Sequence, residues 1–464
     1  MWGPELPWTH FDFLGGWWLW WASAHPGDEL ALQCWPDGTL PLQHHFPNPF
    51  DGWVLGPLAF PDGVPDASSW RWWNAAQLSH HLANVGATGL LARAVGLRWS
   101  DAVLAAGLTA ASPVMLHEIA GGRTLPGAVW PGLLGLVALL RGRGGLAGLL
   151  IGLQGLAYLY TGALFGLVAL ILRPTWRLAS AGLLLAPYAI YLAPLLDGLH
   201  GRPPPAGFSE LPVSGLLGLA EVPERLRVLP GLGVVGFVGL AVARRWRLLA
   251  AAVLVLLVAL GPGPGWRIDD TLFVSPIAWA QWAIPGLGRM HHPVRAALLL
   301  VPLLAVGAAA LTQRAPRWAP LAALVLLWPQ RPVLHLAPSW ASPAEPPGRE
   351  AALWLRAHAD AVVDLTGAGD AALGLQPIHG RPMLEGLRRE GRRADGTGSV
   401  CATLRHRADG WLRGESQPGL AADLAAAGFS HVLVVERRGA VDRDALEADL
   451  GAEVVPGVYA LPAR

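Results

Sequence analysis

The sequence predicts an α-helical membrane protein that crosses the bilayer about ten times and ends in a small soluble α/β domain. Of its 464 residues, 53% are hydrophobic and only 14% are charged, and the mean hydropathy is +0.39. Soluble domains carry about 25% charged residues, so this composition indicates lipid around much of the chain. The apolar residues are concentrated in residues 75–330, whereas residues 345–464 carry charges at the density of a soluble domain.

The charge balance and the cysteine usage exclude several classes of protein. The net charge at pH 7 is +1, which predicts no basic surface for nucleic acid. Every basic residue is an arginine, which indicates a coding bias rather than a mechanism. Cys34 and Cys401 are too few and too far apart for a disulfide framework or a metal site, although they could pair in an oxidising compartment.

Residues 1–74 are expected to form a long loop outside the cytoplasm. Residues 13–24 are rich in tryptophan and too short to span a bilayer, so they predict a helix that lies in the membrane interface. A chain that starts on this side with no preceding helix is unusual. We hypothesise that a start site placed too late has removed a first helix, which an apolar segment in a longer upstream reading frame would support.

The apolar stretches between residues 75 and 331 are read as membrane spans, for which about 20 residues are needed. The run 145–173 is too long for one upright helix, so it predicts two short helices that meet near residues 158–160. The expected spans are 75–95, 100–116, 126–140, 145–158, 159–173, 178–196, 229–243, 247–262, 294–312 and 316–331.

Arginines in the short connections predict the orientation, because short cytoplasmic loops collect positive charge. They fall at every second connection, so all of them are expected on the cytoplasmic side. The long connections 1–74, 197–228 and 263–293 and the tail from residue 332 then lie on the other side. The clusters are Arg93 and Arg98; Arg141 and Arg143; Arg173 and Arg177; Arg244, Arg245 and Arg247; and Arg314 and Arg317.

The tail predicts a separate α/β domain. A helical run precedes a β-branched run three times, in AALWLRAHA and AVVDL, in LAADLAAAGF and HVLVVE, and in DALEADLG and EVVPGVYALP. The expected organisation is therefore a first extracytoplasmic loop with an interfacial helix (1–74), a transmembrane domain (75–331), a Pro-rich linker (332–348) and an extracytoplasmic α/β domain (349–464).

Asp12 is the first candidate for chemistry, because it stands just before the tryptophan cluster of residues 17–21. One interpretation is an amphipathic interfacial helix and nothing more, which the position alone favours. In the other, Asp12 is a carboxylate held at the membrane surface that deprotonates a nucleophile beside a lipid-linked substrate.

The segment SPVMLHEIAGGRTLPGAVWPGL, residues 112–133, breaks a span with polar residues. Non-helical backbone at membrane depth persists only where it lines a cavity or is buried in protein. His117, Glu118 and Arg123 are therefore expected to line an outward-facing pocket, unless they form an ordinary loop with a solvated Glu–Arg pair. His80 and His81 have no metal-ligand spacing, so they are expected to be satisfied histidines between packed helices.

The segment IPGLGRMHHPVRAALLL, residues 284–300, is an exception to the arginine rule. It places Arg289 and Arg295 at the outer boundary of a span, with His291 and His292 between them. Guanidinium groups bind phosphate through paired hydrogen bonds, which would explain arginines on this side. The alternative is that both side chains simply snorkel to the interface.

Taken in order from Asp12 to the tail, these stretches resemble the GT-C superfamily of membrane glycosyltransferases, which use polyprenyl- or dolichyl-phosphate sugars as donors. The resemblance rests on the acidic first loop, the Trp-rich interfacial helix, the segment 112–133, the P-x-R entry at residues 293–295 and the outer C-terminal domain. It departs from the superfamily because the first helix, which normally precedes the aspartate, is missing from this sequence.

The resemblance implies roles for particular residues. Asp12 matches the catalytic base of the first loop, and Glu118 lies where several members place a further acidic or metal-linked group. Arg289 and Arg295 match the segment that approaches the donor phosphate. The implied reaction is inverting transfer of a sugar, in which Asp12 takes a proton from the acceptor hydroxyl and an arginine stabilises the departing phosphate.

The expected protein is therefore a bacterial glycosyltransferase of the inner (cytoplasmic) membrane. Its expected partners are a polyprenyl-phosphate sugar donor, the lipid bilayer and an acceptor that the sequence does not identify, and nucleic acid is excluded. No metal site is assigned, and a divalent metal ion is the one cofactor left open. The alternatives are a transporter or flippase for lipid-linked saccharides and a non-catalytic membrane protein that keeps the GT-C architecture.

Overall fold

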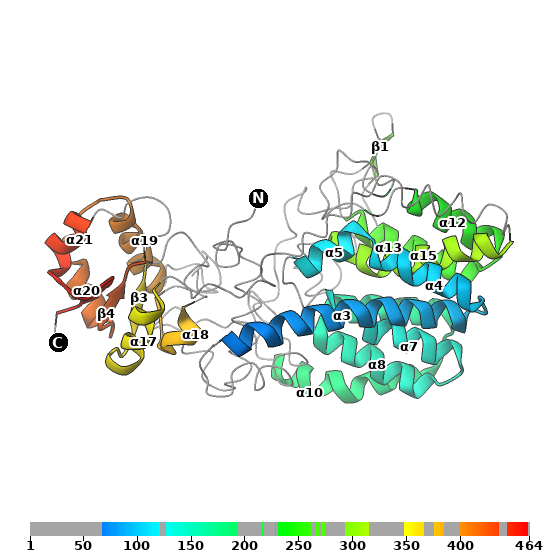
Figure 1. The fold of residues 1–464 in the computed structure, drawn as a ribbon, viewed down its shortest axis with the longest axis horizontal. Helices are drawn as coiled ribbons and strands as arrows, with labels where there is room; N and C mark the ends of the chain where they lie inside the picture. Colours follow the sequence, from blue (N-terminus) through cyan, green and yellow to red (C-terminus); the bar gives the residue numbers. More distant parts are fainter. Residues whose placement is uncertain are drawn as a thin grey trace. The chain divides into compact units, whose positions relative to one another are not determined.

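The computed structural model describes residues 67–120, 127–192, 231–261, 266–268, 271–273, 293–314, 348–365, 375–384, 400–435 and 443–462, together with Leu216 and Val228. The chain divides into two compact units (Figure 1), one of Ala75–His335 and the other of Met1–Asn74 with Leu336–Arg464. The four-part division expected from the sequence, with its linker and loop, stays a prediction.

The first unit is built from helices that run side by side in Figure 1. The α-helices are α3 (Ala67–Ala94), α4 (Trp99–Ala110), α5 (Pro113–Ala120), α7 (Trp130–Leu140), α8 (Gly144–Ala157), α9 (Leu159–Leu172), α10 (Gly182–Leu192), α12 (Leu232–Val242), α13 (Trp246–Ala259) and α15 (Ala297–Arg314). Two 3-10 turns, η3 (Trp176–Ala181) and η7 (Pro293–Ala296), precede α10 and α15, and a short antiparallel pair joins β1 (Trp266–Ile268) to β2 (Thr271–Phe273).

The core of this unit forms around α15, which packs against α4, α12 and α13, while α8 packs against α7, α9 and α10. The closest approach is between α12 and α15, because Gly239 and Gly236 face Gly307 with backbone against backbone. Small residues at such a crossing let two helices come close enough for extensive van der Waals contact, as is common between helices in lipid.

Several predicted spans are shorter than expected. The helix Pro293–Arg314 is the one described helix long and apolar enough to cross a membrane, with 22 residues and a hydropathy of 2.2. The other apolar helices are Trp130–Leu140, Gly144–Ala157, Leu159–Leu172, Leu232–Val242 and Trp246–Ala259, each of 10–17 residues. The predicted span 316–331 lies outside the described residues, and the number of spans stays a prediction.

The prediction of one continuous helix over residues 100–116 is wrong. The structure ends α4 at Ala110 and begins α5 at Pro113. Proline has no backbone N–H and disfavours the α conformation in the residue before it, which here is Ser112, so the helix breaks. The expected break in residues 145–173 is confirmed, since Tyr158 separates α8 from α9 in an extended conformation with φ −157° and ψ 109°.

The helical unit carries apolar side chains on its exposed surface as well as in its core. Exposed valine and leucine side chains are found on seven of the ten described α-helices of this unit, with Val103 at 68% and Leu183 at 71% exposure. A helix that is hydrophobic all round belongs inside a large core or in lipid. The exposed apolar side chains of the described helices therefore agree with the membrane environment predicted from the composition.

Four of the arginine clusters meet at one end of the helical unit. The guanidinium of Arg245 lies beside Gly96, with its Nη2 3.7 Å from the position that a Cβ would take there. The guanidinium of Arg173 lies in the same way beside Gly142, with its Nη1 at 3.6 Å. Nη1 of Arg247 donates to the backbone oxygen of Leu172 at 2.9 Å. The connections after α3, α7, α9 and α12 are therefore neighbours, as their arginines predicted; which side of the membrane they face stays a prediction.

The C-terminal unit has the three helix–strand pairs expected from the sequence. The helices α17 (Arg349–His358), α20 (Leu420–Ala426) and α21 (Arg443–Leu450) precede the strands β3 (Val362–Asp364), β4 (His431–Leu433) and β5 (Glu453–Val455), and β5 continues into β6 (Val458–Ala460). The sheet order is β3-β4-β6-β5, with β3 parallel to β4 and the other pairs antiparallel. Two further helices, α18 (Gln376–His379) and α19 (Val400–Leu412), complete the described part.

Polar side chains inside the C-terminal unit have structural roles. Asp449 accepts hydrogen bonds from the Trp411 ring at 2.8 Å, the Gln417 backbone and the Ser416 hydroxyl, which joins α21 to α19. His379 is fully buried, and its Nδ1 accepts from the Arg381 backbone N–H at 3.1 Å. Burial, and then the charge of Arg381, lowers the pKa of His379 to about 3, so this imidazole is neutral and unsuited to proton transfer near neutral pH.

Candidate functional site

Two amide side chains clamp the backbone just before α7, around the non-helical residues Ala128 and Val129. Nδ2 of Asn84 in α3 donates to the backbone oxygen of Gly127 at 2.7 Å, and its Oδ1 accepts from the Val129 N–H at 3.0 Å. Nε2 of Gln154 in α8 donates to the Ala128 oxygen at 2.9 Å, and its Oε1 accepts from the Gly132 N–H at 3.1 Å.

Both amides are almost completely buried, with Asn84 at 1% and Gln154 at 0% exposure. A buried backbone group without a partner costs about 1–3 kcal/mol, and more where no water can reach it. The clamp therefore allows an irregular backbone inside an apolar helical unit. It also fixes where α7 begins, just before Pro131 at the first helical positions.

His80 supports the same segment from the next turn of α3. Its Nδ1 accepts a hydrogen bond from Nε1 of Trp130 at 3.0 Å, and its side chain is 8% exposed. The expectation that His80 is a satisfied histidine between packed helices is confirmed. His81, its neighbour, is half-buried and points to a different side of the helix.

A second break, at Tyr158, lies beside the start of the helix Pro293–Arg314, which is long and apolar enough to cross a membrane. Nη1 of Arg295, in the turn η7 before α15, donates to the Tyr158 hydroxyl at 3.1 Å. The guanidinium carbon of Arg295 lies 5.7 Å from the centroid of the same ring, within the range of cation–π attraction. Tyr160 packs edge-on against Tyr158 with ring centroids 5.7 Å apart.

One hydroxyl connects the two breaks. Oγ1 of Thr161 donates to the backbone oxygen of Tyr158 at 2.9 Å and accepts from Nε2 of Gln154 at 2.9 Å. Gln154 therefore holds the start of α7 and, through Thr161, the end of α8. The position of the Tyr158 ring, and with it the contact to Arg295, is tied to the clamp at residues 127–129.

Glu118 lies next to the clamped segment. Its side chain is 4% exposed, and its Cβ would lie 3.8 Å from a Cβ placed at Gly127, the residue whose oxygen Asn84 binds. His117, on the same helix α5, is half-buried, and α5 also contacts α15. The solvated Glu–Arg pair considered for this segment does not fit a carboxylate so deeply buried, whereas an outward-facing pocket at these residues stays a prediction.

Helix lengths give the depth of these groups. Counted from Gly144 at the arginine-rich end, Gln154 is about 15 Å and Tyr158 about 21 Å along α8, at 1.5 Å per residue. The hydrocarbon core of a bilayer is about 30 Å thick. If α8 crosses the membrane upright, as predicted, with Gly144 at its edge, Gln154 would lie near the midplane and Tyr158 in the half away from the arginines.

Five of the candidate site residues lie outside the described residues. They are Asp12, Arg123, Arg289, His291 and His292. Within the described ranges, no group of three or more His, Cys, Asp or Glu side chains is arranged to hold a metal ion.

The sequence reasoning missed the amides and the hydroxyls of this site. Asn84, Gln154 and Thr161 are polar residues inside apolar helices, a placement that usually marks a functional or strongly constrained position. That signal was available for each of them. The sequence signal could not give the hydrogen-bond partner of each side chain, because the partners are distant in the chain; Asn84 and Val129 are 45 residues apart.

Comparisons with known proteins leave the family open. No family model matches the chain, and neither does any curated protein sequence. Among solved structures, the chain is similar to arabinofuranosyltransferase AftD from Mycobacteria, with a TM-score of 0.46 and 19% sequence identity. The match covers 83% of this chain and 31% of that one, so this chain spans less than a third of the length of AftD.

Proposed function

We propose that the protein is a polytopic membrane glycosyltransferase of the GT-C type. It transfers a sugar, with inversion, from a polyprenyl-phosphate donor to an acceptor on the extracytoplasmic face. The observation that supports this proposal most directly is Arg295. Its guanidinium is held by the Tyr158 ring and hydroxyl at the start of the helix Pro293–Arg314, which is long and apolar enough to cross a membrane.

Arg295 has the properties of a phosphate-binding group. A guanidinium presents five N–H donors in a planar fork that matches phosphate, and its hydrogen bonds to an anion are about twice as strong as neutral ones. A lipid-linked phosphate carries the anionic oxygens that such a fork binds.

The proposed reaction needs one base and one anion-stabilising group. Asp12 takes the proton from the acceptor hydroxyl, whose oxygen forms a bond to the anomeric carbon from the face opposite the phosphate. The bond between that carbon and the phosphate oxygen breaks, and the electron pair stays with the polyprenyl phosphate. Arg289 and Arg295 stabilise the added negative charge, and Glu118 is proposed as a second catalytic carboxylate. The residues proposed to contact the substrates are His117, Arg123, His291 and His292.

The rival class is a transporter for lipid-linked saccharides, which often uses broken helices at the bilayer midplane. The broken segment 127–129 is of that kind. However, Asn84 and Gln154 occupy backbone groups on both sides of the break, which suits a rigid support better than a substrate gate. The enzyme is therefore preferred, and the assay below separates the two.

The test uses the purified full chain in lipid vesicles with radiolabelled polyprenyl-phosphate sugars and a crude glycan acceptor. The enzyme predicts consumption of donor and release of polyprenyl phosphate, abolished by Asp12→Asn, while Asp360→Asn, an exposed carboxylate of the C-terminal unit, leaves the rate unchanged. Donor that crosses the vesicle membrane without being consumed would identify a transporter. Equal rates for the wild type and Asp12→Asn would remove Asp12 from the role of base.

A further inference from the structure

Three helices that end at the arginine-rich side share one turn. In α3, α7 and α12 the residue after the C-cap donates its N–H three residues back, and the next residue donates five residues back. This pattern requires a left-handed residue, normally glycine, at the first of the two positions. Gly96 has φ +87° and Gly142 has φ +82°, but in α12 the position is occupied by Arg244 with φ +56°.

Arg244 is the one non-glycine residue with positive φ in the described part of the chain. The left-handed conformation brings Cβ close to a carbonyl oxygen and costs an L-residue about 1–2 kcal/mol, a cost that glycine avoids. Two sister turns of the same molecule use glycine at this position. An arginine in a backbone conformation that disfavours it indicates that its side chain has a functional role, rather than one in stabilising the fold.

The surroundings of Arg244 are strongly cationic. Its neighbours Arg245 and Arg247 are also exposed, and Nη2 of Arg245 lies beside Gly96 of the α3–α4 turn. That turn adds Arg93, over the Trp99 ring at 4.8 Å. The described carboxylate in these two turns is Asp101, and it is already bound to Arg98 at 2.9 Å.

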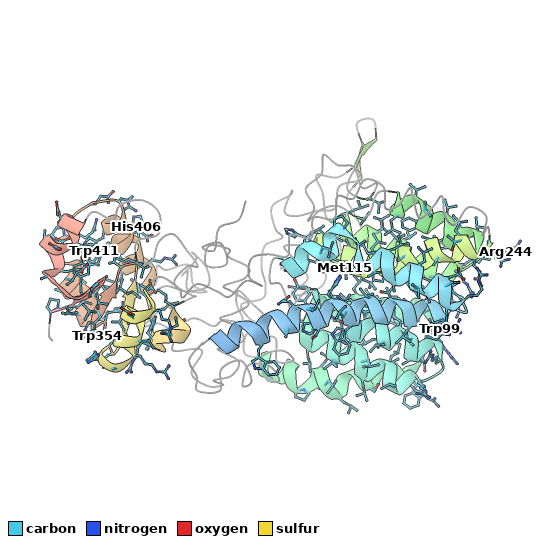
Figure 2. All side chains as sticks on the ribbon, in the orientation of Figure 1. Trp99, Met115, Arg244, Trp354, His406 and Trp411 are labelled. Atoms are coloured by element: carbon cyan, nitrogen blue, oxygen red, sulfur yellow. The ribbon has the colours of Figure 1, made fainter. Side chains whose placement is uncertain are left out.

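Exposed tryptophans flank this charge. Trp99 is 65% exposed at the start of α4 and Trp246 is 61% exposed at the start of α13, each directly after an arginine. Figure 2 shows Trp99 and Arg244 at the same end of the helical unit. Tryptophan at a helix end is typical of the level of the lipid headgroups, where the indole ring is apolar and its N–H is wet.

We propose that the arginine pair Arg244–Arg245, with the adjoining α3–α4 turn, binds the phosphate of an anionic phospholipid. The exposed Trp99 and Trp246 rings hold the site at headgroup depth. Arg244 occupies the left-handed position that is normally glycine in such a turn, and it thereby places a guanidinium there. The site does not depend on the proposed glycosyltransferase activity. It belongs to the end of the helices opposite Tyr158 and Arg295.

The test compares full-length protein in nanodiscs of phosphatidylcholine with and without phosphatidylglycerol. Arg244→Gly relieves the left-handed residue, so it should raise the thermal unfolding midpoint in pure phosphatidylcholine by about 2 °C. The same substitution should weaken phosphatidylglycerol binding, measured by native mass spectrometry, about fivefold, the effect of about 1 kcal/mol per arginine. Stability and binding thus move in opposite directions.

Two further variants make the result specific. Arg244→Lys keeps the positive charge, which supplies the attraction to an anionic headgroup, and should retain binding within about twofold. Arg413→Gln removes an exposed arginine from the C-terminal unit and should leave lipid binding unchanged. A stabilised Arg244→Gly protein with unchanged phosphatidylglycerol binding would overturn the proposal, as would an equal loss of binding in Arg413→Gln.

Discussion

Tyr158 combines a backbone role with a side-chain role. Its extended backbone ends α8 and allows α9 to begin one residue later. Its phenol oxygen accepts from Arg295, and its ring lies within cation–π distance of the same guanidinium. An arginine has many rotamers in an open site, so a partner that fixes its head lowers the entropy lost when a phosphate binds.

We therefore predict that Tyr158→Phe weakens binding of polyprenyl phosphate about tenfold, because a hydrogen bond to a charged group is worth about 1.5–3 kcal/mol. The ring, and hence the fold, should be retained. Isothermal titration of the full chain in detergent measures the affinity, and the unfolding midpoint should stay within about 2 °C.

Tyr459→Phe is the matched control, because it removes a phenol that bonds Glu453 at 3.1 Å in the C-terminal unit. It should leave the affinity unchanged. In an Arg295→Gln background, Tyr158→Phe should cause no further loss. A full tenfold loss in that background would show that Tyr158 does not act through Arg295.

At the scale of the element, the start of α7 depends on side chains from two other helices. Trp130–Leu140 is only 11 residues long, too short to be stable alone in water and preceded by irregular backbone. Asn84 and Gln154 supply the partners that a longer helix would have supplied from its own backbone. The clamp thus replaces one turn of helix with side-chain hydrogen bonds.

Gln154→Met tests this dependence. Methionine fills a similar volume but leaves the Ala128 oxygen and the Gly132 N–H without their partner, at about 1–3 kcal/mol each. The unfolding midpoint of the full chain should fall by several degrees, and amide exchange should rise in peptides that cover residues 127–140. Leu170→Met, on an exposed face of α9, should change neither value; equal effects of both substitutions would contradict the clamp.

Local patterns predicted the elements better than their junctions. The long apolar run 145–173 and the tyrosines within it indicated the break at Tyr158, and the helix–strand alternation of the tail indicated the C-terminal sheet. The division of residues 100–116 was missed, although Pro113 was visible, because the apolar composition continues past it. The clamp could not be predicted, because periodicity indicates on which face of a helix a residue lies but not which group it hydrogen-bonds.

At the scale of the whole molecule, the arginines give the helical unit a polarity. Their clusters meet at one end, and the buried amides, Tyr158 and Arg295 lie toward the other. Charge counting along the sequence was sufficient for the first part of this arrangement, because connections on one side of a bundle are neighbours whatever the helix packing. Asp12 and Arg289 lie outside the described residues, and sequence patterns give no geometry for the loops predicted there.

The orientation can be tested with single cysteines in a background with Cys34→Ser and Cys401→Ser. We predict that a membrane-impermeant maleimide labels Ala422→Cys, exposed on α20, from outside intact cells or spheroplasts. Ser100→Cys, exposed at the arginine-rich end, should be labelled only after permeabilisation. The reverse pattern would invert the orientation, and labelling of both in intact cells would exclude a cytoplasmic arginine end.

If α8 and α9 cross the membrane, as we propose, their lengths have a consequence for the surrounding lipid. Each has 14 residues and is about 21 Å long, about 9 Å less than an average hydrocarbon core. Such hydrophobic mismatch is relieved where the bilayer thins and acyl chains bend toward the short helices. On the side of Tyr158, the headgroup layer would then sink toward the protein, and a phosphate on a long polyisoprenoid would reach Arg295 without leaving its own leaflet.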